Sequence, residues 1–323
     1  MLNLYFRGDD VLENDNACVI VVEGLTKKYG DLVAVKEINF CVRQGEIFGF
    51  LGPNGAGKTS TVRMLCGLTK ITSGKAKIYG YDVVRNHKNV KRIIGVVPES
   101  SNLYWDLTCL DNLLFCGEMF GVPREERLSR AIKLLKSFGL WDKRNVKFKN
   151  LSKGLKRRLT IAAALIHNPK ILFMDEPTAG LDVFSKRMLW NKILKLKENG
   201  VTIFLTTHNV REAFEICDRI AIINKGRIVA LGRPWELKRA FSPKGIVEAI
   251  FHPRNPKVEE ISRLRGVIGV VEEKGLLKII TYDAVSVLEE IAKLAKSRRL
   301  DIYLLNVRGL DAEELFVKIV GGS

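Results

Sequence analysis

The sequence lacks a long apolar run, because no stretch in its 323 residues approaches 18 consecutive apolar side chains. A helix that spans a membrane needs about 20 predominantly apolar residues, so we predict no transmembrane helix. A signal peptide is not expected either, because Asp9, Asp10 and Glu13 stand where its apolar segment would have to be. We interpret residues 1–16 as a flexible lead-in, either native or derived from a tag.

The sequence also lacks a Cys-x-x-Cys pair, although it contains six cysteines. This absence argues against a cysteine metal site and against a redox motif of that type. Most of the cysteines stand among apolar residues, as buried thiols do. We therefore predict free thiols in a reducing compartment. The six positions are Cys18, Cys41, Cys66, Cys109, Cys116 and Cys217.

Acidic residues are scarce relative to basic ones, and the chain has a net charge of +17. The excess lies almost entirely in the first 239 residues, because residues 240–323 hold 13 basic and 12 acidic side chains. A basic surface suits nucleotides, anionic lipid headgroups or nucleic acid. We favour solvated lysines on a nucleotide-binding domain and expect no nucleic-acid partner.

A glycine-rich loop lies between a short apolar run, residues 47–51, and a segment predicted to begin a helix, residues 61–66. Its spacing, Gly-x-x-x-x-Gly-Lys-Thr, matches a Walker A phosphate-binding loop without a mismatch. Glycines allow positive φ and leave space for a phosphate, so successive N–H groups converge on the anion. Lys58 adds a charge for the β- and γ-phosphates, and the Thr59 hydroxyl is a Mg²⁺ ligand. The predicted ATP-binding residues of the loop are Gly52, Pro53, Asn54, Gly55, Ala56, Gly57, Lys58, Thr59 and Ser60.

A second apolar run, residues 171–174, ends in Asp175 and Glu176. This is a Walker B pattern, in which a buried strand delivers Asp175 beside the phosphate-binding loop as a second Mg²⁺ ligand. Glu176 follows at the position from which a carboxylate polarises an attacking water. Residues 201–207 predict another strand that ends at His208, where an imidazole can hydrogen-bond a γ-phosphate.

The order of predicted elements indicates an α/β fold: a P-loop NTPase core with an antiparallel β subdomain. Tyr29 precedes a turn between the first two strands, and its ring is a candidate platform for adenine. Strand-like segments flank the phosphate-binding loop at residues 19–22, 33–40, 75–79 and 93–97. Helical periodicity over residues 107–120, 124–138 and 155–166 predicts an all-helical insert spanning about residues 99–166. A helix is expected over residues 181–199.

Residues 241–323 predict a separate accessory or regulatory domain, which leaves residues 17–240 for the nucleotide-binding domain. Helix and strand alternate there as in a small α+β domain, for which a ferredoxin-like arrangement is a candidate. Strand-like segments stand at residues 245–251, 267–271, 276–280 and 302–305, and an amphipathic helix is predicted over residues 285–297.

Residues 151–158, Leu-Ser-Lys-Gly-Leu-Lys-Arg-Arg, resemble the signature motif of the ATP-binding cassette (ABC) ATPases. Together with the other motifs, which follow the family's order over residues 18–240, they make the chain resemble the ATPase subunit of an ABC transporter. The resemblance assigns roles to Tyr29 in the adenine loop, Glu99 at the Q-loop position, Asp182 in the D-loop and His208 as the switch. The signature residues that it would bring to the nucleotide of a second subunit are Leu151, Ser152, Lys153 and Gly154.

Two departures from the family pattern stand at functional positions. Lys153 and Leu155 replace a glycine and a glutamine of the signature motif, and Lys153 adds positive charge near the phosphate. Glu99 stands where the family has a glutamine. A carboxylate is a hard oxygen ligand that suits Mg²⁺, so we place Glu99 with Thr59 and Asp175 in the predicted metal set.

The resemblance implies a Mg²⁺-dependent ATPase that forms a head-to-tail homodimer on ATP and drives a separate integral membrane permease from the cytoplasmic face. The permease would contact the helical insert near residues 99–111. Residues 310–317 resemble the last helix of cassettes that serve ABC-2 drug exporters, which favours export. The alternative is a soluble cassette ATPase acting on ribosomes or DNA. Such proteins usually carry two cassettes, or a coiled-coil or zinc insertion, whereas this chain has one Walker A motif.

Overall fold

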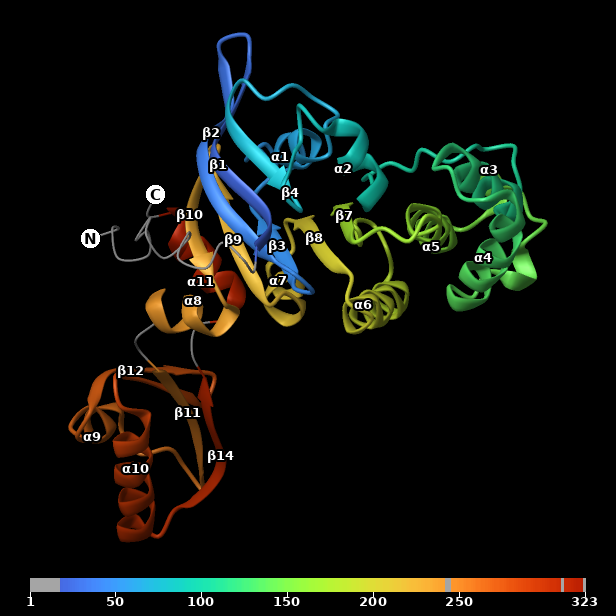
Figure 1. The fold of residues 1–323 in the computed structure, drawn as a ribbon. Helices are drawn as coiled ribbons and strands as arrows, with labels where there is room; N and C mark the ends of the chain where they lie inside the picture. Colours follow the sequence, from blue (N-terminus) through green and yellow to red (C-terminus); the bar gives the residue numbers. More distant parts are fainter. Residues whose placement is uncertain (1–17, 242–244, 309–310, 322–323) are drawn as a thin grey trace. The chain divides into compact units, whose positions relative to one another are not determined.

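The computed structural model describes residues 18–241, 245–308 and 311–321, and the chain divides into two compact units after Arg233 (Figure 1). The domain boundary that the sequence predicts, after residue 240, falls inside helix α8 (Pro234–Phe241), which belongs to the second unit. The exact limit between independently folding domains stays a prediction.

A six-stranded sheet forms the centre of the first unit, with the order β10-β9-β3-β8-β7-β6. Its strands are parallel from β9 to β6, and β10 pairs antiparallel with β9. Parallel strands are covered on both faces, which explains why β3, β7 and β8 consist of buried residues throughout. The bounds are β3 Ile47–Leu51, β6 Ile94–Val97, β7 Ile171–Asp175, β8 Thr202–Thr207, β9 Arg219–Asn224 and β10 Arg227–Gly232.

An antiparallel sheet with the order β2-β1-β4-β5 shares one hydrophobic core with the parallel sheet. At its centre, Phe204 of β8 lies 6.0 Å from Phe40 of β2 and 5.6 Å from Phe48 of β3, measured between ring centroids. This packing holds strand β3, and with it the start of the glycine-rich loop. The bounds are β1 Cys18–Tyr29, β2 Leu32–Arg43, β4 Ser73–Ile78 and β5 Tyr81–Asp82.

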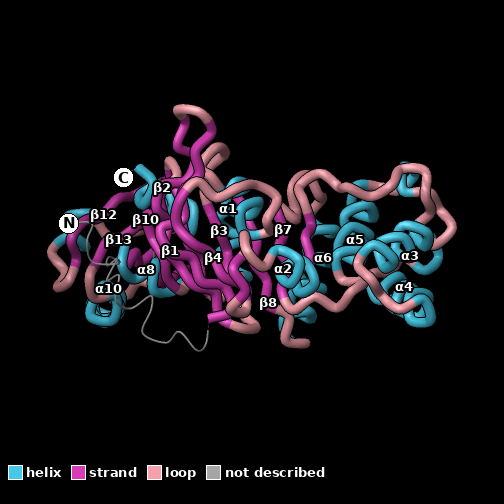
Figure 2. Tube along the Cα trace, turned by 45° about the horizontal axis from the view of Figure 1, so that its top comes forward, coloured by secondary structure: helices cyan, strands magenta, loops and turns pink. Residues whose placement is uncertain are grey.

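The chain between β6 and β7 forms an all-helical segment, which Figures 1 and 2 show to one side of the parallel sheet. Predicted and observed helix ends differ by a few residues because caps set them: Thr108 and Ser152 accept from N–H groups at the starts of α3 and α5. The segment contains α3 Cys109–Met119, α4 Arg124–Ser137, α5 Lys153–Ala164 and the 3₁₀ turns η2 Trp141–Lys143 and η3 Phe148–Asn150. The other helices of the unit are α1 Lys58–Leu65, α2 His87–Ile93, α6 Val183–Glu198 and α7 Val210–Ile216.

None of the helices in the described ranges has the length and hydropathy that crossing a membrane requires.

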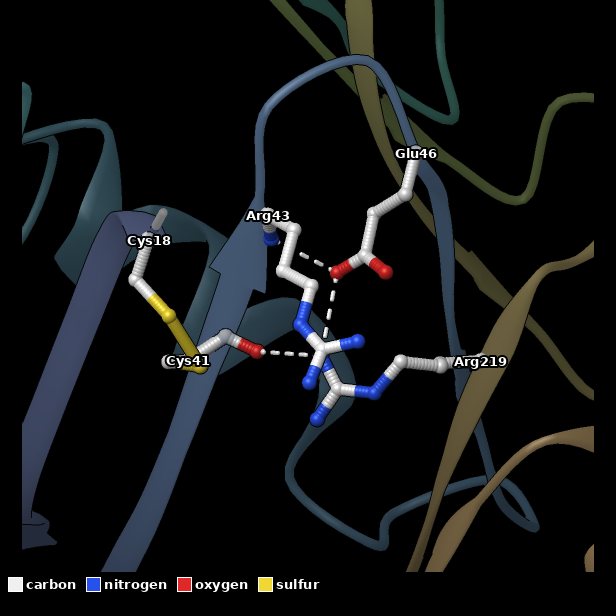
Figure 3. The surroundings of a disulfide bond; sticks show 5 residues. All are labelled: Cys18, Cys41, Arg43, Glu46 and Arg219. Atoms are coloured by element: carbon white, nitrogen blue, oxygen red, sulfur yellow. Dashed lines mark hydrogen bonds and ion pairs between the residues drawn. A yellow bond between two sulfur atoms is a disulfide. The ribbon is translucent and has the colours of Figure 1, made fainter. Parts of the chain in front are cut away.

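Cys18 at the start of β1 and Cys41 near the end of β2 form a disulfide (Figure 3). The prediction of a free thiol was wrong for these two residues, because strand pairing brings together cysteines 23 residues apart and spacing does not reveal register. Beside the bond, Arg219 donates to the Cys41 carbonyl and pairs with Glu46 at 3.1 Å (Figure 3). The cysteines confirmed as free are Cys66, Cys109, Cys116 and Cys217.

The second unit contains an antiparallel sheet with the order β12-β13-β11-β14, and the strands follow the chain order β-α-β-β-α-β. This is the order of a ferredoxin-like domain. Helices α9 and α10 contribute to its hydrophobic core, while α8 contacts the last helix, α11. The bounds are β11 Gly245–His252, α9 Val258–Ser262, β12 Val267–Glu273, β13 Leu276–Thr281, α10 Ala284–Arg298, β14 Asp301–Arg308 and α11 Ala312–Gly321. Of the predicted last helix, residue 310 lies outside the described residues.

Candidate functional site

The glycine-rich loop runs from the end of β3 into α1, as its sequence predicts. Gly55 and Gly57 adopt φ values of 79° and 108°, which side chains disfavour. A Cβ at Gly57 would also lie 2.6 Å from the carbonyl oxygen of Ala34 on β2. Gly57 is the N-cap of α1, and no side chain caps the helix. The first N–H groups of α1 are thus left for another acceptor, which is the arrangement of an anion site.

Lys58 is buried at the first position of α1, and its ammonium group turns back over the loop. It donates to the carbonyl oxygens of Gly52 at 2.7 Å and Pro53 at 3.2 Å. Its third neighbour is the Glu176 carboxylate, with 3.3 Å between Nζ and Oε1. The surroundings of this buried ammonium group have a low dielectric constant and screen its positive charge little. The group therefore attracts a further anion strongly.

The Asp175 carboxylate is buried at the end of β7, where the Thr59 hydroxyl of α1 donates to its Oδ1 at 3.4 Å. The Thr206 hydroxyl of the neighbouring strand β8 donates to the same oxygen. Thr206 also receives the Glu176 N–H at 3.1 Å, so one threonine orients both acidic residues. The predicted pair Thr59 and Asp175 is therefore brought together because β3, which leads into α1, and β7 both pair with β8.

Glu176 follows β7 with a φ of 46°, in the left-handed region that a glutamate rarely adopts. Its Oε2 lies 2.9 Å from Nδ1 of His208, which follows β8. None of the described residues forms a hydrogen bond with its buried Oε1, although Lys58 is close enough for an ion pair. A buried carboxylate oxygen in this state has capacity for a further donor, such as a water molecule.

A cavity of about 570 Å³, large enough for a nucleotide, is lined by Lys58, Thr59, Glu176 and His208. Tyr29 stands at its edge, with its hydroxyl 3.5 Å from Ser60 and its ring under the ammonium group of Lys27. Hydrogen bonding to Ser60 lowers the pKa of Tyr29. The residues that line the cavity are Tyr29, Leu32, Ala34, Asn54, Gly55, Gly57, Lys58, Thr59, Ser60, Glu99, Glu176 and His208.

Several residues that the sequence predicts for the site do not line this cavity. Gly52, Pro53, Ala56 and Asp175 are not part of its lining, although Asp175 contacts Thr59. The signature residues and Asp182 are not part of it either. Leu151 is buried, and Lys153 lines a separate hollow of about 370 Å³.

The signature residues pack against the D-loop of the same chain. Ser152 caps α5, and Asp182 caps α6 by accepting from the N–H and hydroxyl of Ser185, which lowers the pKa of Asp182. A Cβ at Gly154 would lie 2.8 Å from the Ser185 hydroxyl, so a larger residue there would displace that hydroxyl. The Lys153 ammonium lies against Gly180 in the same way, where a Cβ would come within 2.0 Å of Nζ.

No sequence motif assigns a function to Thr206 or Arg157, and both contact the backbone or carboxylates of the Walker B end. Neither could be found by motif spacing, because Thr206 reads as one more β-branched strand residue and Arg157 as one of three consecutive basic residues.

The side chains suit a nucleotide with a divalent cation. Mg²⁺ is usually held by one or two carboxylates together with substrate phosphates, and Asp175 with Thr59 provides such a partial ligand set beside the uncapped helix start. No cluster of three or more His, Cys, Asp or Glu side chains suited to a metal occurs within residues 18–241, 245–308 and 311–321. A complete all-protein metal cage is thus not part of the described structure.

Comparison with known proteins gives consistent results. The family model described as ABC transporter matches residues 35–179. The linearmycin resistance ATP-binding protein LnrL of Bacillus subtilis is 34% identical over 94% of this chain and 98% of its own length. The Nod factor export ATP-binding protein I of Rhizobium sp. strain N33 is 37% identical over 94% and 97%.

Among solved structures, a dimeric bacterial ABC transporter cassette superimposes with a TM-score of 0.62 and 29% identity, covering 67% of this chain and 98% of the cassette. A structure of cbiO1 from Clostridium perfringens, part of a cbiONQ transporter complex, gives a TM-score of 0.63 at 28% identity over 68% and 90%. The phosphate-binding loop, the Walker B carboxylates and these similarities agree, and the chain belongs to the ATP-binding subunits of ABC transporters, a family of ATPases.

Proposed function

We propose that two copies of this chain bind two ATP molecules head to tail and use their hydrolysis to drive a separate membrane permease in the direction of export. The observation that carries the proposal is the distribution of the motifs. The catalytic groups Lys58, Glu176 and His208 face one cavity, whereas the signature residues lie outside that cavity. A signature motif that acts on ATP must then act on the ATP of another subunit.

Each residue of the cavity has a role in this proposal. Lys58 and the uncapped amides of α1 bind the phosphates, and the ring of Tyr29 stacks on adenine. Thr59 and Asp175, joined by Glu99, would hold Mg²⁺, which would neutralise charge on the phosphate oxygens. Because Lys58 already neighbours the Glu176 carboxylate, the same ammonium can serve both the phosphates and the base.

Glu176 is the general base in this proposal. Its Oε1, which forms no hydrogen bond with the described residues, accepts the proton of a water aligned with the γ-phosphorus, while Oε2 keeps its hydrogen bond to His208. His208 hydrogen-bonds the γ-phosphate, and Asp182 couples the two sites through the α6 cap. The signature residues Ser152 and Gly154 reach the γ-phosphate of the partner's ATP from the start of α5.

The direction and the location rest on the relatives. The two relatives that match over 94% of this chain, including its second unit, are named for linearmycin resistance and for Nod factor export. We place the protein at the cytoplasmic face of the cell membrane, bound to its permease near residues 99–111. Fractionation tests the rival, a ribosome- or DNA-directed ATPase: recovery with detergent-extracted membranes supports the transporter, and recovery with ribosomes supports the rival.

Glu176→Gln tests the base and the dimer together. Loss of the carboxylate should reduce turnover by about 10²–10⁴-fold while ATP stays bound. The ATP-bound dimer should then persist, which size measurement with and without Mg-ATP detects. A variant that remains monomeric in Mg-ATP, or that turns over like the native protein, would contradict the proposal.

A further inference from the structure

Arg157 lies in α5, five residues after the Ser152 cap, and its side chain is buried. In the described part of the chain, every hydrogen bond of its guanidinium goes to a main-chain carbonyl oxygen. Nε donates to Pro177 at 2.7 Å and Nη2 to Asp175 at 2.9 Å. The remaining acceptors are the carbonyl oxygens of Glu176, Pro98 and, at 3.3 Å, Glu99. Burial lowers the pKa of Arg157 to about 10, so the group stays charged at neutral pH.

The convergence of these carbonyls requires a cation with several donors in one plane. Three consecutive carbonyl oxygens, from Asp175 to Pro177, point toward the same place, and their dipoles repel one another without a donor between them. A guanidinium offers five N–H donors in a fixed fork, whereas an ammonium group offers three around one atom. Arginine is therefore the side chain that satisfies this arrangement.

The contact bears on Glu176 because of its backbone. A non-glycine residue at a φ of 46° is strained and persists only when the surroundings hold it. Arg157 binds the carbonyl of Glu176 and those of both neighbours, while Thr206 binds its N–H. The carboxylate then projects between Lys58 and His208.

The same guanidinium joins three segments that are distant in the sequence. It belongs to the helix that begins with the signature residues, it holds the end of β7, and it holds the chain just after β6 at Glu99. A movement of α5 would therefore be transmitted directly to Glu176 and to Glu99.

We propose that Arg157 is a positioning residue, which fixes the Glu176 carboxylate for water activation and links it to the helix of the signature motif. The inference rests on the proposed function, in which Glu176 is the general base. Arg157 touches neither the nucleotide cavity nor the predicted metal ligands' side chains, and it acts through the Glu176 backbone.

Arg157→Lys keeps the charge but removes the fork, and kinetics on the full-length protein measures the result. We expect kcat to fall by about 10²-fold, as when a catalytic group is displaced by about 1 Å, with the ATP dissociation constant within about threefold of native. Arg157→Met, which removes the buried charge, is the second variant in case the ammonium group disturbs folding, and the folding of both variants is checked by thermal unfolding.

Arg127→Lys is the control, because Arg127 also donates to a carbonyl and pairs with a carboxylate, but within the helical segment.

A double-mutant cycle with Glu176→Gln shows whether Arg157 acts through the base. In that background, single-turnover rates should be nearly insensitive to Arg157→Lys. An equal loss in both backgrounds would overturn the inference, as would a native kcat or a parallel loss of ATP affinity. If Glu176→Gln alone retained native turnover, the proposed function would fail instead, so the two failures are distinguishable.

Discussion

The two units of this protein differ most in what their interiors contain. The first buries a set of charged and amide side chains that includes Lys58, Asn112, Arg157, Asp175 and Glu176. Among the described residues of the second unit, the only buried polar side chain is that of Thr281, which donates to the Gly266 carbonyl at 2.7 Å. Its core is otherwise aliphatic, apart from Phe251.

This difference in buried polar side chains indicates that the reactive groups of the chain lie in the first unit. Burying a charge costs several kcal/mol unless partners compensate, so a unit built only for packing avoids it. The first unit accepts this cost around a cavity, where in the proposed function the same charges bind phosphate and activate water. Charged pairs of the second unit, such as Arg308 with Glu248, occur instead on partly exposed sheet positions.

Among the changes that compare the two units, the largest expected effect on turnover comes from replacing one lysine in each unit by methionine. Lys58→Met should reduce turnover by about 10²–10³-fold, the usual loss when one preorganised donor is removed from a reacting group. Lys278→Met in the second unit removes an ion pair to Glu273 and should leave turnover unchanged. Steady-state ATPase measurements on both variants test this, and comparable losses in the two would break the comparison.

An intermediate effect is expected from Glu99→Gln, which removes a charge from the cavity and keeps the shape. Glu99 faces the same cavity as Glu176, so repulsion between the carboxylates and phosphates should make ATP binding depend steeply on Mg²⁺. In the variant we expect the gain in ATP affinity from saturating Mg²⁺ to be smaller by about fivefold or more. ATP affinity across a magnesium titration measures it, with Glu272→Gln of the second unit as control. Superimposable curves would show that Glu99 does not act on the metal.

The smallest effect is expected from removing the whole second unit, residues 234–323. The remaining chain keeps every motif and its own hydrophobic core, so its ATP affinity and turnover should stay within about twofold of native. A parallel truncation after residue 240, at the boundary predicted from the sequence, leaves most of α8 without α11. We expect that version to be the less soluble of the two. Loss of ATP binding in both would mean that the second unit is part of the nucleotide-binding fold.

The sequence alone determined the local features of this protein. The glycine spacing of the phosphate-binding loop, the carboxylates at the end of an apolar run and most of the strand–helix order up to β8 follow from short-range sterics and periodicity, which neighbouring residues encode. In the second unit the predicted strands and helix agree with β11 to β14 and α10, because its alternation is regular. The resemblance to the ABC ATPases, confirmed by the comparisons, also rests on such local motifs.

Tertiary structure decided what depends on partners far apart in the chain. The Cys18–Cys41 disulfide follows from the pairing of β1 with β2, and the joint orientation of Asp175 and Glu176 from Thr206 on the neighbouring strand. Arg157 is one basic residue among several in the sequence, and only folding brings the carbonyls of residues 98–99 and 175–177 around it. Side-chain type is written in the sequence, but the donor or acceptor that satisfies a buried group is chosen by packing.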